Sequence, residues 1–229
     1  MKLKFLPQEA LKLIAGLTML IDHIGATLYR SGKLRAIGRV AFPIYCFLMA
    51  EGLRHTRDKT KYLLRLGFGL ILSELPFDLL FFGGFTWAHQ SVMFTLGLGC
   101  LMGCIMDYLP HLLLKPLVAI PFYFAAEFLH TDYGGMGVLM VGLFLLSEEL
   151  PMKRLIQTIG VAALCFFIPS TKVSLLGFRF PLQLFAVFAM VPICLYSGKK
   201  LTHSRALQWG FYLWYPVHLA VLYLICLLK

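Results

Sequence analysis

Long apolar runs alternate with short polar segments along the whole chain. About nine runs approach the roughly 20 apolar residues that a helix needs to cross a bilayer core. They lie near residues 11–29, 35–53, 62–82, 91–109, 116–130, 133–149, 155–170, 178–196 and 209–228. Transmembrane barrels need alternating segments of about ten residues instead. The pattern therefore predicts an all-α, polytopic membrane protein with about nine transmembrane helices, in one domain over residues 1–229.

Composition strengthens this prediction and leaves no room for a separate soluble domain. The 229 residues are 59% hydrophobic and only 14% charged, whereas soluble domains carry about 25% charged residues. The N-terminal segment has no small-residue cleavage site ahead of a short apolar region, so we expect no removable signal peptide. All six cysteines fall within apolar runs, which favours packing over redox or metal chemistry.

The net charge of +10 is explained by membrane orientation. Of the 21 lysines and arginines, about 14 fall on the side of the N-terminus and about 7 on the other, with the run RHTRDKTK contributing most. The bias predicts a cytoplasmic N-terminus and, with nine spans, an external C-terminus. Basic loops that face anionic lipid account for the charge, and we expect no nucleic-acid partner.

Ionisable residues inside the predicted spans are the main candidates for function. Each costs about 2.5–3.5 kcal/mol at the bilayer centre, so each should face a cavity or another polar group. These ionisable residues, together with the polar Gln183, are Asp22, His23, Arg39, Glu74, Asp78, Glu127, Gln183 and His218. Most lie between the midplane and the outer surface. Their similar depth predicts a polar cavity that opens outward.

Structural roles compete with functional ones at several of these positions. Arg39 is expected to pair with a carboxylate, either Asp22 or Asp78. Glu74 and Asp78 flank Pro76 and have an alternative role as hydrogen-bond partners of opened helix ends. His218 alone is typical of a hydrogen-bonded core histidine.

His23 is the strongest candidate, because an imidazole beside a carboxylate in an apolar helix is costly twice. Adjacent helical residues point about 100° apart, so Asp22 is not expected to bond to it. The partner that orients His23 should therefore come from another span. Near the inner end of the second span, Glu51 is expected to form a surface ion pair with Arg54 or His55.

The chain lacks the motifs of several enzyme classes. It has no G-x-S-x-G, no H-E-x-x-H and no P-loop, which argues against hydrolases and nucleotide-driven motors. We expect no metal cofactor.

Six blocks in sequence carry a family resemblance. The segments IDHIG, IGRVAFPIYCFLMAEGLRHT, YLLRLGFGLILSELPFD, VMFTLGLG, DYGGMGVL and FYLWYPVHL resemble the TraX family in order and spacing, over nearly the whole chain. That family is named for the conjugal-transfer pilin acetylase and is related to the transmembrane acyltransferases that include the lysosomal heparan-glucosamine N-acetyltransferase. One position departs from the pattern, since Ser91 stands where the family often has Asn.

The resemblance implies transfer of an acetyl group from cytosolic acetyl-CoA to an extracytoplasmic amine or hydroxyl acceptor. The acceptor would be a pilin N-terminus or another peptide amine, a sugar or a lipid headgroup. The resemblance also implies the bacterial cytoplasmic (inner) membrane. The expected partners are the lipid bilayer, acetyl-CoA and the acceptor. A second copy of the chain, in a homo-oligomer, is a further possible partner.

Roles for individual residues follow from combining the resemblance with span placement. His23 would act as general base or carry the acetyl group briefly. Asp22 would fix local hydrogen bonding together with Arg39, and Arg39 would alternatively stabilise an oxyanion. Five residues would bind substrate, with the first two suited to an acceptor ammonium: Glu74, Asp78, Glu127, Gln183 and His218. Arg54, Arg57 and Lys61 would meet the CoA phosphates, although positive-inside orientation alone also explains this basic loop.

Two other classes compete with the acetyltransferase. A proton-coupled carrier needs intramembrane Asp, Glu and His residues of this kind, but the chain shows no internal repeat. A non-catalytic scaffold for envelope or pilus assembly has no need of ionisable residues at one depth.

Overall fold

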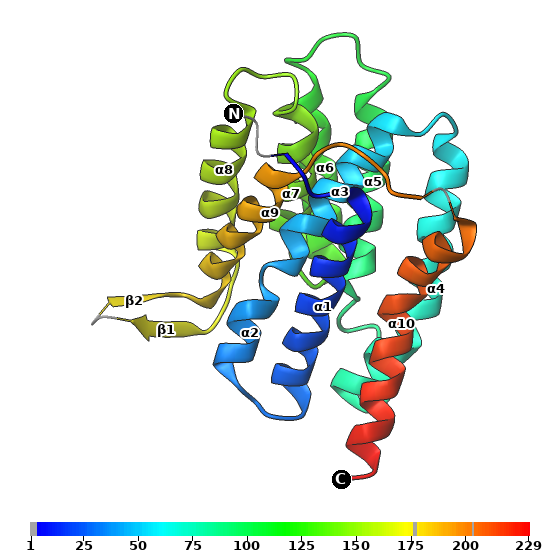
Figure 1. Cartoon of the computed structure of the whole chain (residues 1–229), viewed down its shortest axis with the longest axis vertical. Helices are drawn as coiled ribbons and strands as arrows, with labels where there is room; N and C mark the ends of the chain where they lie inside the picture. The colour runs from blue at the N-terminus through cyan, green and yellow to red at the C-terminus, as the bar shows by residue number, and fades with distance from the viewer. Residues whose placement is uncertain (1–3, 176–177, 203) are drawn as a thin grey trace. The chain divides into compact units, whose positions relative to one another are not determined.

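The computed structural model describes residues 4–175, 178–202 and 204–229 (Figure 1). The chain divides into two compact units. Met1–Tyr45 and Val161–Lys229 form the terminal unit, and Cys46–Gly160 form the central unit. Two helices, α3 and α8, run from one unit into the other. The expectation of a single domain stays a prediction.

The chain is predominantly helical, and every predicted span contains a helix. The α-helices are α1 (Gln8–Thr27), α2 (Gly32–Gly38), α3 (Ala41–His55), α4 (Lys59–Phe82), α5 (Val92–Met106), α6 (Lys115–Phe128), α7 (Gly134–Leu146), α8 (Lys153–Phe167), α9 (Met190–Leu195) and α10 (Arg205–Leu227). A 3₁₀ helix, η1 (Leu182–Ala189), precedes α9. Most helices begin and end within a few residues of the predicted positions.

The span predicted over 35–53 is broken into α2 and α3. Pro43 lies in the first turn of α3 and has no backbone N–H to donate to the carbonyl of Arg39. Its ring also clashes with that carbonyl in a continuous helix. The chain therefore turns at Arg39 and Val40 and restarts at Ala41.

The prediction of a helix from residue 178 was wrong. Strands β1 (Lys172–Leu175) and β2 (Phe178–Pro181) form an antiparallel hairpin, with Lys172 opposite Pro181 and Leu175 opposite Phe178. Proline disfavours helical backbone in the residue before it, so Phe180 stays extended and the helical segment begins only at Leu182. The fold is therefore not purely α-helical.

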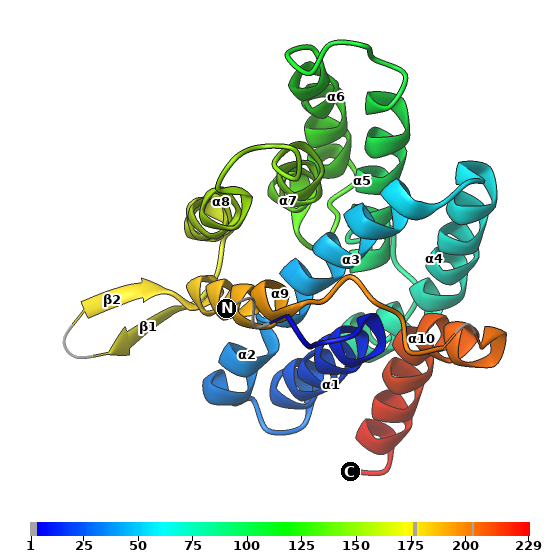
Figure 2. The same ribbon diagram turned by 45° about the horizontal axis from the view of Figure 1, so that its top comes forward.

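In the terminal unit, α1 lies beside both α2 and α10 (Figures 1 and 2). The indole Nε1 of Trp214 on α10 donates a 3.1 Å hydrogen bond to the carbonyl of Gly16 on α1. A Cβ at Gly16 would lie 3.0 Å from that indole nitrogen, so glycine permits the close approach. This contact fixes the alignment of α10 along α1.

Gly38 at the end of α2 packs directly against Asp22 of α1. A Cβ at this position would lie 2.6 Å from Oδ1 and 2.7 Å from Cα of Asp22, and both residues belong to packed helices with little room to shift. We expect Gly38→Ala to lower the free energy of unfolding by about 1–3 kcal/mol, the usual cost of overpacking. Gly32→Ala in the same helix is the matched control, because a Cβ at Gly32 would meet nothing within 4 Å.

Unfolding of both variants in detergent, followed by helical circular dichroism, measures this difference. Gly32→Ala should leave stability unchanged or raise it by up to about 1 kcal/mol, because alanine favours helix over glycine. Equal stability of the two variants would contradict the close contact between α2 and Asp22.

The central unit is a bundle in which α5 packs against α4, α6 and α7 (Figure 2). Glycines on α5 allow the closest approach, since a Cβ at Gly99 would lie 2.7 Å from a methyl group of Val141 on α7. Small residues at helix contacts are typical of membrane helices.

Length and composition indicate a membrane protein. Within the described residues, three helical segments are long and apolar enough to cross a membrane: Gln8–Thr27, Gly32–His55 and Ala206–Leu227. Shorter apolar helices cover Val92–Met106, Gly134–Leu146 and Leu182–Leu195. The count of nine crossings stays a prediction.

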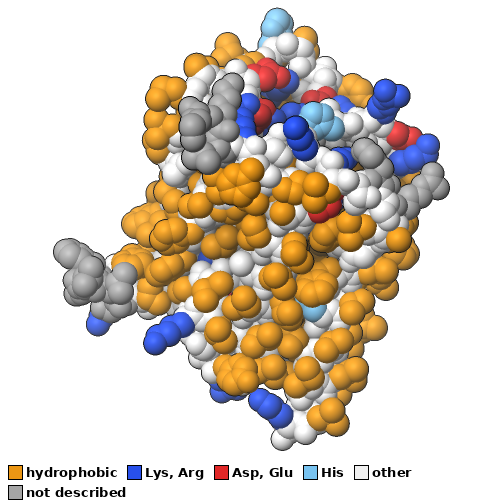
Figure 3. Space-filling view, viewed as in Figure 1, with side chains coloured by type: hydrophobic (Ala, Val, Ile, Leu, Met, Phe, Trp, Pro, Cys, Tyr) orange, Lys and Arg blue, Asp and Glu red, His pale blue; other side chains and the backbone are white. Residues whose placement is uncertain are grey.

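Exposed apolar stripes along individual helices agree with contact to lipid. On α4 the exposed large side chains recur at helical spacing, at Leu64, Phe68, Ile71 and Leu75. Hydrophobic side chains cover much of the face drawn in Figure 3. Soluble monomers rarely expose apolar surface so extensively.

Candidate functional site

A largely buried ion pair joins α1 to the turn that follows α2. Nη2 of Arg39 donates to both carboxylate oxygens of Asp22 at 2.5 Å. Nη1 donates to Oε1 of Gln183 at 3.2 Å, and Nε donates to the carbonyl of Arg35 at 3.3 Å. Of the two carboxylates considered for Arg39, Asp22 is therefore a partner. Each nitrogen of the guanidinium already has a protein acceptor.

His23 is hydrogen-bonded to a second histidine from the other end of the chain. Its Nδ1 lies 2.7 Å from Nε2 of His218 on α10. Nδ1 of His218 in turn lies 2.7 Å from the carbonyl oxygen of Trp214, one turn earlier. The prediction that the partner of His23 comes from another span is confirmed. The alternative role for His218, a core histidine with hydrogen-bond partners, also holds.

In the central unit, Glu74 and Asp78 hold the segment between α4 and α5. Oε1 of Glu74 accepts a 3.3 Å hydrogen bond from the backbone N–H of Ser91, at the start of α5. Oδ2 of Asp78 accepts a 3.0 Å hydrogen bond from the N–H of Thr86. Both contacts agree with the structural role considered for this pair.

The same region carries buried oxygens that lack a partner within the described part of the chain. Three are acceptor oxygens, Oε2 of Glu74, Oδ1 of Asp78 and Oε1 of Gln90, and three are hydroxyl oxygens that can also donate, of Ser91, Thr95 and Thr131. Asp78 is fully buried and Gln90 nearly so. The carboxylate and amide oxygens can only accept and need donors. The neighbouring hydroxyl groups can supply some of them, and a bound donor group could supply the others.

His89, in the same connecting segment, lies close to acidic side chains. Its Nε2 lies 3.7 Å from Oδ1 of Asp132. The nearby carboxylate of Asp132 raises the pKa of His89; burial opposes the rise, and the charges of Glu74 and Asp78 add to it. The acidic surroundings thus favour the protonated form of His89, in which it would offset part of the negative charge.

Glu127 on α6 binds the start of α7. Its Oε1 accepts a 2.8 Å hydrogen bond from the N–H of Gly135. Gly134 has φ +53°, a left-handed conformation that favours glycine. A carboxylate at a helix N-terminus is electrostatically favourable. This contact is therefore enough to explain why a carboxylate stands at position 127 within an apolar run.

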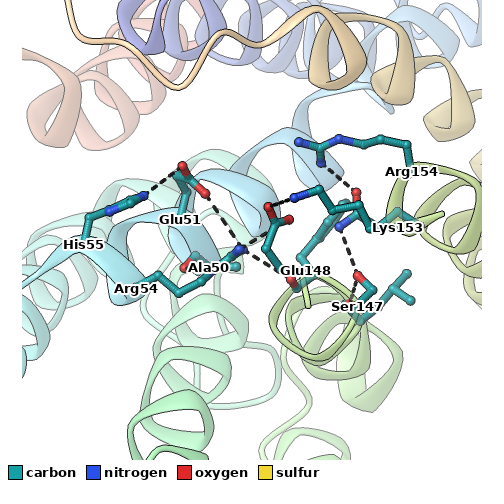
Figure 4. A network of polar contacts seen from close by, with 11 residues as sticks. Ala50, Glu51, Arg54, His55, Ser147, Glu148, Lys153 and Arg154 are labelled. Atoms are coloured by element: carbon teal, nitrogen blue, oxygen red, sulfur yellow. Dashed lines mark hydrogen bonds and ion pairs between the residues drawn. The ribbon is translucent and has the colours of Figure 1, made fainter. Parts of the chain in front are cut away.

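Arg54 belongs to a second polar network in the central unit, at the end of α3 (Figure 4). Nη1 of Arg54 lies 3.3 Å from Oε2 of Glu148, and Nη2 donates to the carbonyl of Phe144 at 3.3 Å. Lys153 approaches the other oxygen of Glu148 at 2.5 Å. The contacts expected of Glu51 are also present, a 3.1 Å hydrogen bond with Nε2 of His55 and a 3.9 Å ion pair with Arg54.

A surface hollow of about 470 Å³ adjoins this network. It is lined by Glu148, Leu150, Met152, Lys153, Arg154 and Leu155. Arg57 and Lys61 lie exposed near the start of α4, where Lys61 pairs with Asp58 at 2.9 Å. Among the described residues, no cluster of three or more His, Cys, Asp or Glu side chains could hold a metal ion.

A comparison with protein families decides the relationship suggested by the sequence blocks. The family model described as "TraX protein" matches residues 7–226. The chain belongs to the TraX family. The match includes every residue of the His23 and Asp22 contacts described above.

Two relatives of this TraX-family chain are informative. The "Probable fimbrial assembly protein FimC" of Dichelobacter nodosus is 29% identical, over 93% of the chain and 92% of the relative. An uncharacterized protein of Rickettsia prowazekii is 38% identical over 28% of the chain and 25% of its own length. No solved structure matches the chain.

Sequence reasoning missed some residues of both polar networks in this TraX-family chain. Trp214 supplies the carbonyl that orients His218, and its position four residues before His218 was a usable signal on one helix face. Lys153 and Arg154 were assigned only to membrane orientation. Their contacts with Glu148 and Gln157 depend on tertiary packing that spacing does not reveal.

Proposed function

We propose that this TraX-family protein is a membrane-embedded acetyltransferase that moves an acetyl group from cytosolic acetyl-CoA to an extracytoplasmic amine or hydroxyl acceptor. The observation that carries the proposal is the hydrogen-bonded pair His23–His218 between two apolar helices, one residue along from the Asp22–Arg39 ion pair. Family membership and the name of the fimbrial assembly relative support a pilus-related acceptor.

His23 acts on the acceptor as a general base. It takes the proton from the amine or hydroxyl group as that group attacks the acetyl carbonyl carbon. The new C–N or C–O bond forms, the C–S bond breaks, and the CoA thiolate leaves and recovers the proton. In the covalent alternative, an imidazole nitrogen of His23 first takes the acetyl group from sulfur and then passes it to the acceptor.

Arg39 and Asp22 support this chemistry as a charge pair. Since each guanidinium nitrogen of Arg39 donates to a protein acceptor, we favour a structural role over the stabilisation of an oxyanion. Gln183 completes that pair as an acceptor from Arg39. The pair holds α1 against the turn after α2 and thereby fixes the helix that carries His23.

Glu74 and Asp78 bind an amine acceptor in its ammonium form, which gives one proton to a carboxylate of this pair before the neutral amine attacks and passes its second proton to His23. Their unpartnered oxygens and that of Gln90 are all acceptors, and an ammonium group offers three donors and no acceptor. Glu127 accepts a hydrogen bond at the start of α7. In this scheme it stabilises that helix end and does not contact the acceptor.

The basic residues at the end of α3 and the start of α4 meet the CoA phosphates. Arg54, Arg57 and Lys61 remain the candidates, and we add Lys153 and Arg154, which line the adjacent hollow. The scheme places the N-terminus and these residues on the cytoplasmic side of a bacterial inner membrane, as the positive-inside bias indicates.

A proton-coupled carrier is the second candidate, favoured by the same histidine pair. Hydrogen-bonded histidines inside apolar helices also suit a proton relay. A carrier would acidify proteoliposomes without releasing CoA from acetyl-CoA.

Asp78→Asn tests the ammonium site. The amide still accepts from Thr86 but carries no charge, so we expect the KM for an amine acceptor to rise about 10–100-fold, as for the loss of a charged hydrogen bond. The KM for acetyl-CoA should not change. Asp107→Asn is the matched control, because Asp107 pairs with Lys59 at the end of α5. Equal losses for donor and acceptor would assign Asp78 a purely structural role.

A further inference from the structure

The two imidazole rings are arranged for a linear hydrogen bond within one plane. The rings of His23 and His218 are inclined by only 12°, and their centroids are 5.0 Å apart. The centroid separation is about the 2.7 Å distance between Nδ1 of His23 and Nε2 of His218 plus one ring radius at each end. The two nitrogens therefore lie close to the line that joins the ring centres. Imidazole lone pairs and N–H groups point outward in the ring plane, so this geometry suits N–H···N bonding.

The backbone carbonyl of Trp214 determines which histidine donates. A carbonyl oxygen only accepts, so Nδ1 of His218, 2.7 Å away, must carry a hydrogen. A neutral imidazole has one N–H donor and one acceptor nitrogen. Nε2 of neutral His218 is therefore an acceptor, and Nδ1 of His23 must donate to it. The remaining lone pair of neutral His23 lies on Nε2.

The helices that carry this chain of bonds are held in register. Trp214 and His218 are one turn apart on α10, and Gly16 and His23 are two turns apart on α1. The indole of Trp214 donates to the carbonyl of Gly16 at 3.1 Å, while its own carbonyl accepts from His218. The ring of Tyr215 packs against both histidines, with centroids 6.1 Å from His23 and 5.6 Å from His218. His218 is only 5% exposed, so water does not compete easily for its nitrogens.

We propose that His218 is a positioning residue that fixes His23 in the tautomer with the proton on Nδ1, so that Nε2 of His23 is the atom that takes the proton or the acetyl group. The role rests on the proposed acetyltransferase function. It requires no contact between His218 and the substrate, because His218 acts through His23 alone. An imidazole held in the other tautomer would present an N–H group in place of the lone pair and could neither accept a proton nor attack a thioester there.

Nitrogen NMR of the full-length protein, with ¹⁵N-labelled histidine and in detergent micelles, tests the tautomer directly. The His23 signals are assigned by their loss in His23→Gln. At a pH where both histidines are neutral, we expect a protonated Nδ1 and an unprotonated Nε2 for His23 in the unsubstituted protein. A protonated Nε2 would overturn the proposal without the need for any variant at residue 218.

Two substitutions at residue 218 separate hydrogen bonding from packing. The side-chain oxygen of His218→Gln can accept from Nδ1 of His23, whereas His218→Leu fills space without an acceptor. We expect His218→Leu to lose the single tautomer and to lower kcat by about 10²-fold, the lower range of acid–base contributions. His218→Gln should keep the tautomer and restore kcat to within about tenfold of the unsubstituted protein. A folded His218→Leu protein that keeps both the tautomer and kcat would contradict the role of His218.

Failure of the acetyltransferase proposal remains distinguishable from failure of this inference. If the unsubstituted protein releases no CoA with any acceptor, the proposed reaction is wrong and the positioning role in that reaction falls with it. The NMR comparison of His218→Gln with His218→Leu still decides whether His218 sets the tautomer of His23.

Discussion

Replacement of His23 by alanine is expected to lower the rate of acetyl transfer by at least about 10²-fold. General acid–base catalysis typically increases a reaction rate by about 10²–10⁴-fold. In the proposed reaction, His23 is the base that deprotonates the acceptor. The substitution also removes the 2.7 Å hydrogen bond to His218, but it leaves the Asp22–Arg39 ion pair in place. Steady-state CoA release by purified protein in detergent or liposomes measures the effect.

Two controls distinguish loss of the base from loss of the fold. His111→Ala changes an exposed histidine between α5 and α6 and should keep full activity. Added imidazole should restore part of the activity of His23→Ala, since it can enter the space left by the side chain and act as a base. Retained turnover in folded His23→Ala would remove His23 from the mechanism.

Arg39→Ala is expected to lower the free energy of unfolding by about 3–5 kcal/mol. Removal of one partner from a buried ion pair leaves the other charge uncompensated, and here the carboxylate of Asp22 would lose both 2.5 Å contacts. The substitution also removes the donor to Gln183. Lys33→Ala, on the exposed face of α2, is the matched control and should change stability by no more than about 0.5 kcal/mol.

A double-mutant cycle identifies the ion pair as the source of the loss. Asp22→Ala combined with Arg39→Ala should destabilise less than the sum of the two single substitutions, because neither charge is then left alone. Denaturant or thermal unfolding in detergent gives the four free energies. Additive losses would mean that Asp22 and Arg39 act independently.

Much of the fold follows from apolar run length. A continuous run of 15 or more apolar residues can satisfy its backbone in a bilayer only as a helix, and each predicted run does contain one. The errors lie at prolines. Pro43 breaks one predicted span at Arg39 and Val40, and Pro181 delays the helical segment that was expected from residue 178. In both cases local backbone chemistry overrides hydropathy.

The sequence predicted that the buried polar residues would need partners. It was less informative about which residues those partners are. The cost of an unpaired charge among apolar residues requires a partner for Arg39, and Asp22 provides it. The 100° offset between neighbouring helical residues requires a distant partner for His23. That partner is His218, 195 positions away, and no local pattern links the two. Glu74, Asp78 and Glu127 each accept from a backbone N–H in a connecting segment or at a helix start, contacts that depend on chain turns no periodicity reveals.

The most direct test of the acetyltransferase proposal is a transfer assay in proteoliposomes. Protein is incubated with radiolabelled acetyl-CoA and a peptide with a free N-terminal amine, and both free CoA and labelled peptide are measured. The account predicts equal amounts of CoA and acetylated peptide, with both lost in His23→Ala. Proton flux without CoA release or labelled peptide would contradict the account and favour the carrier.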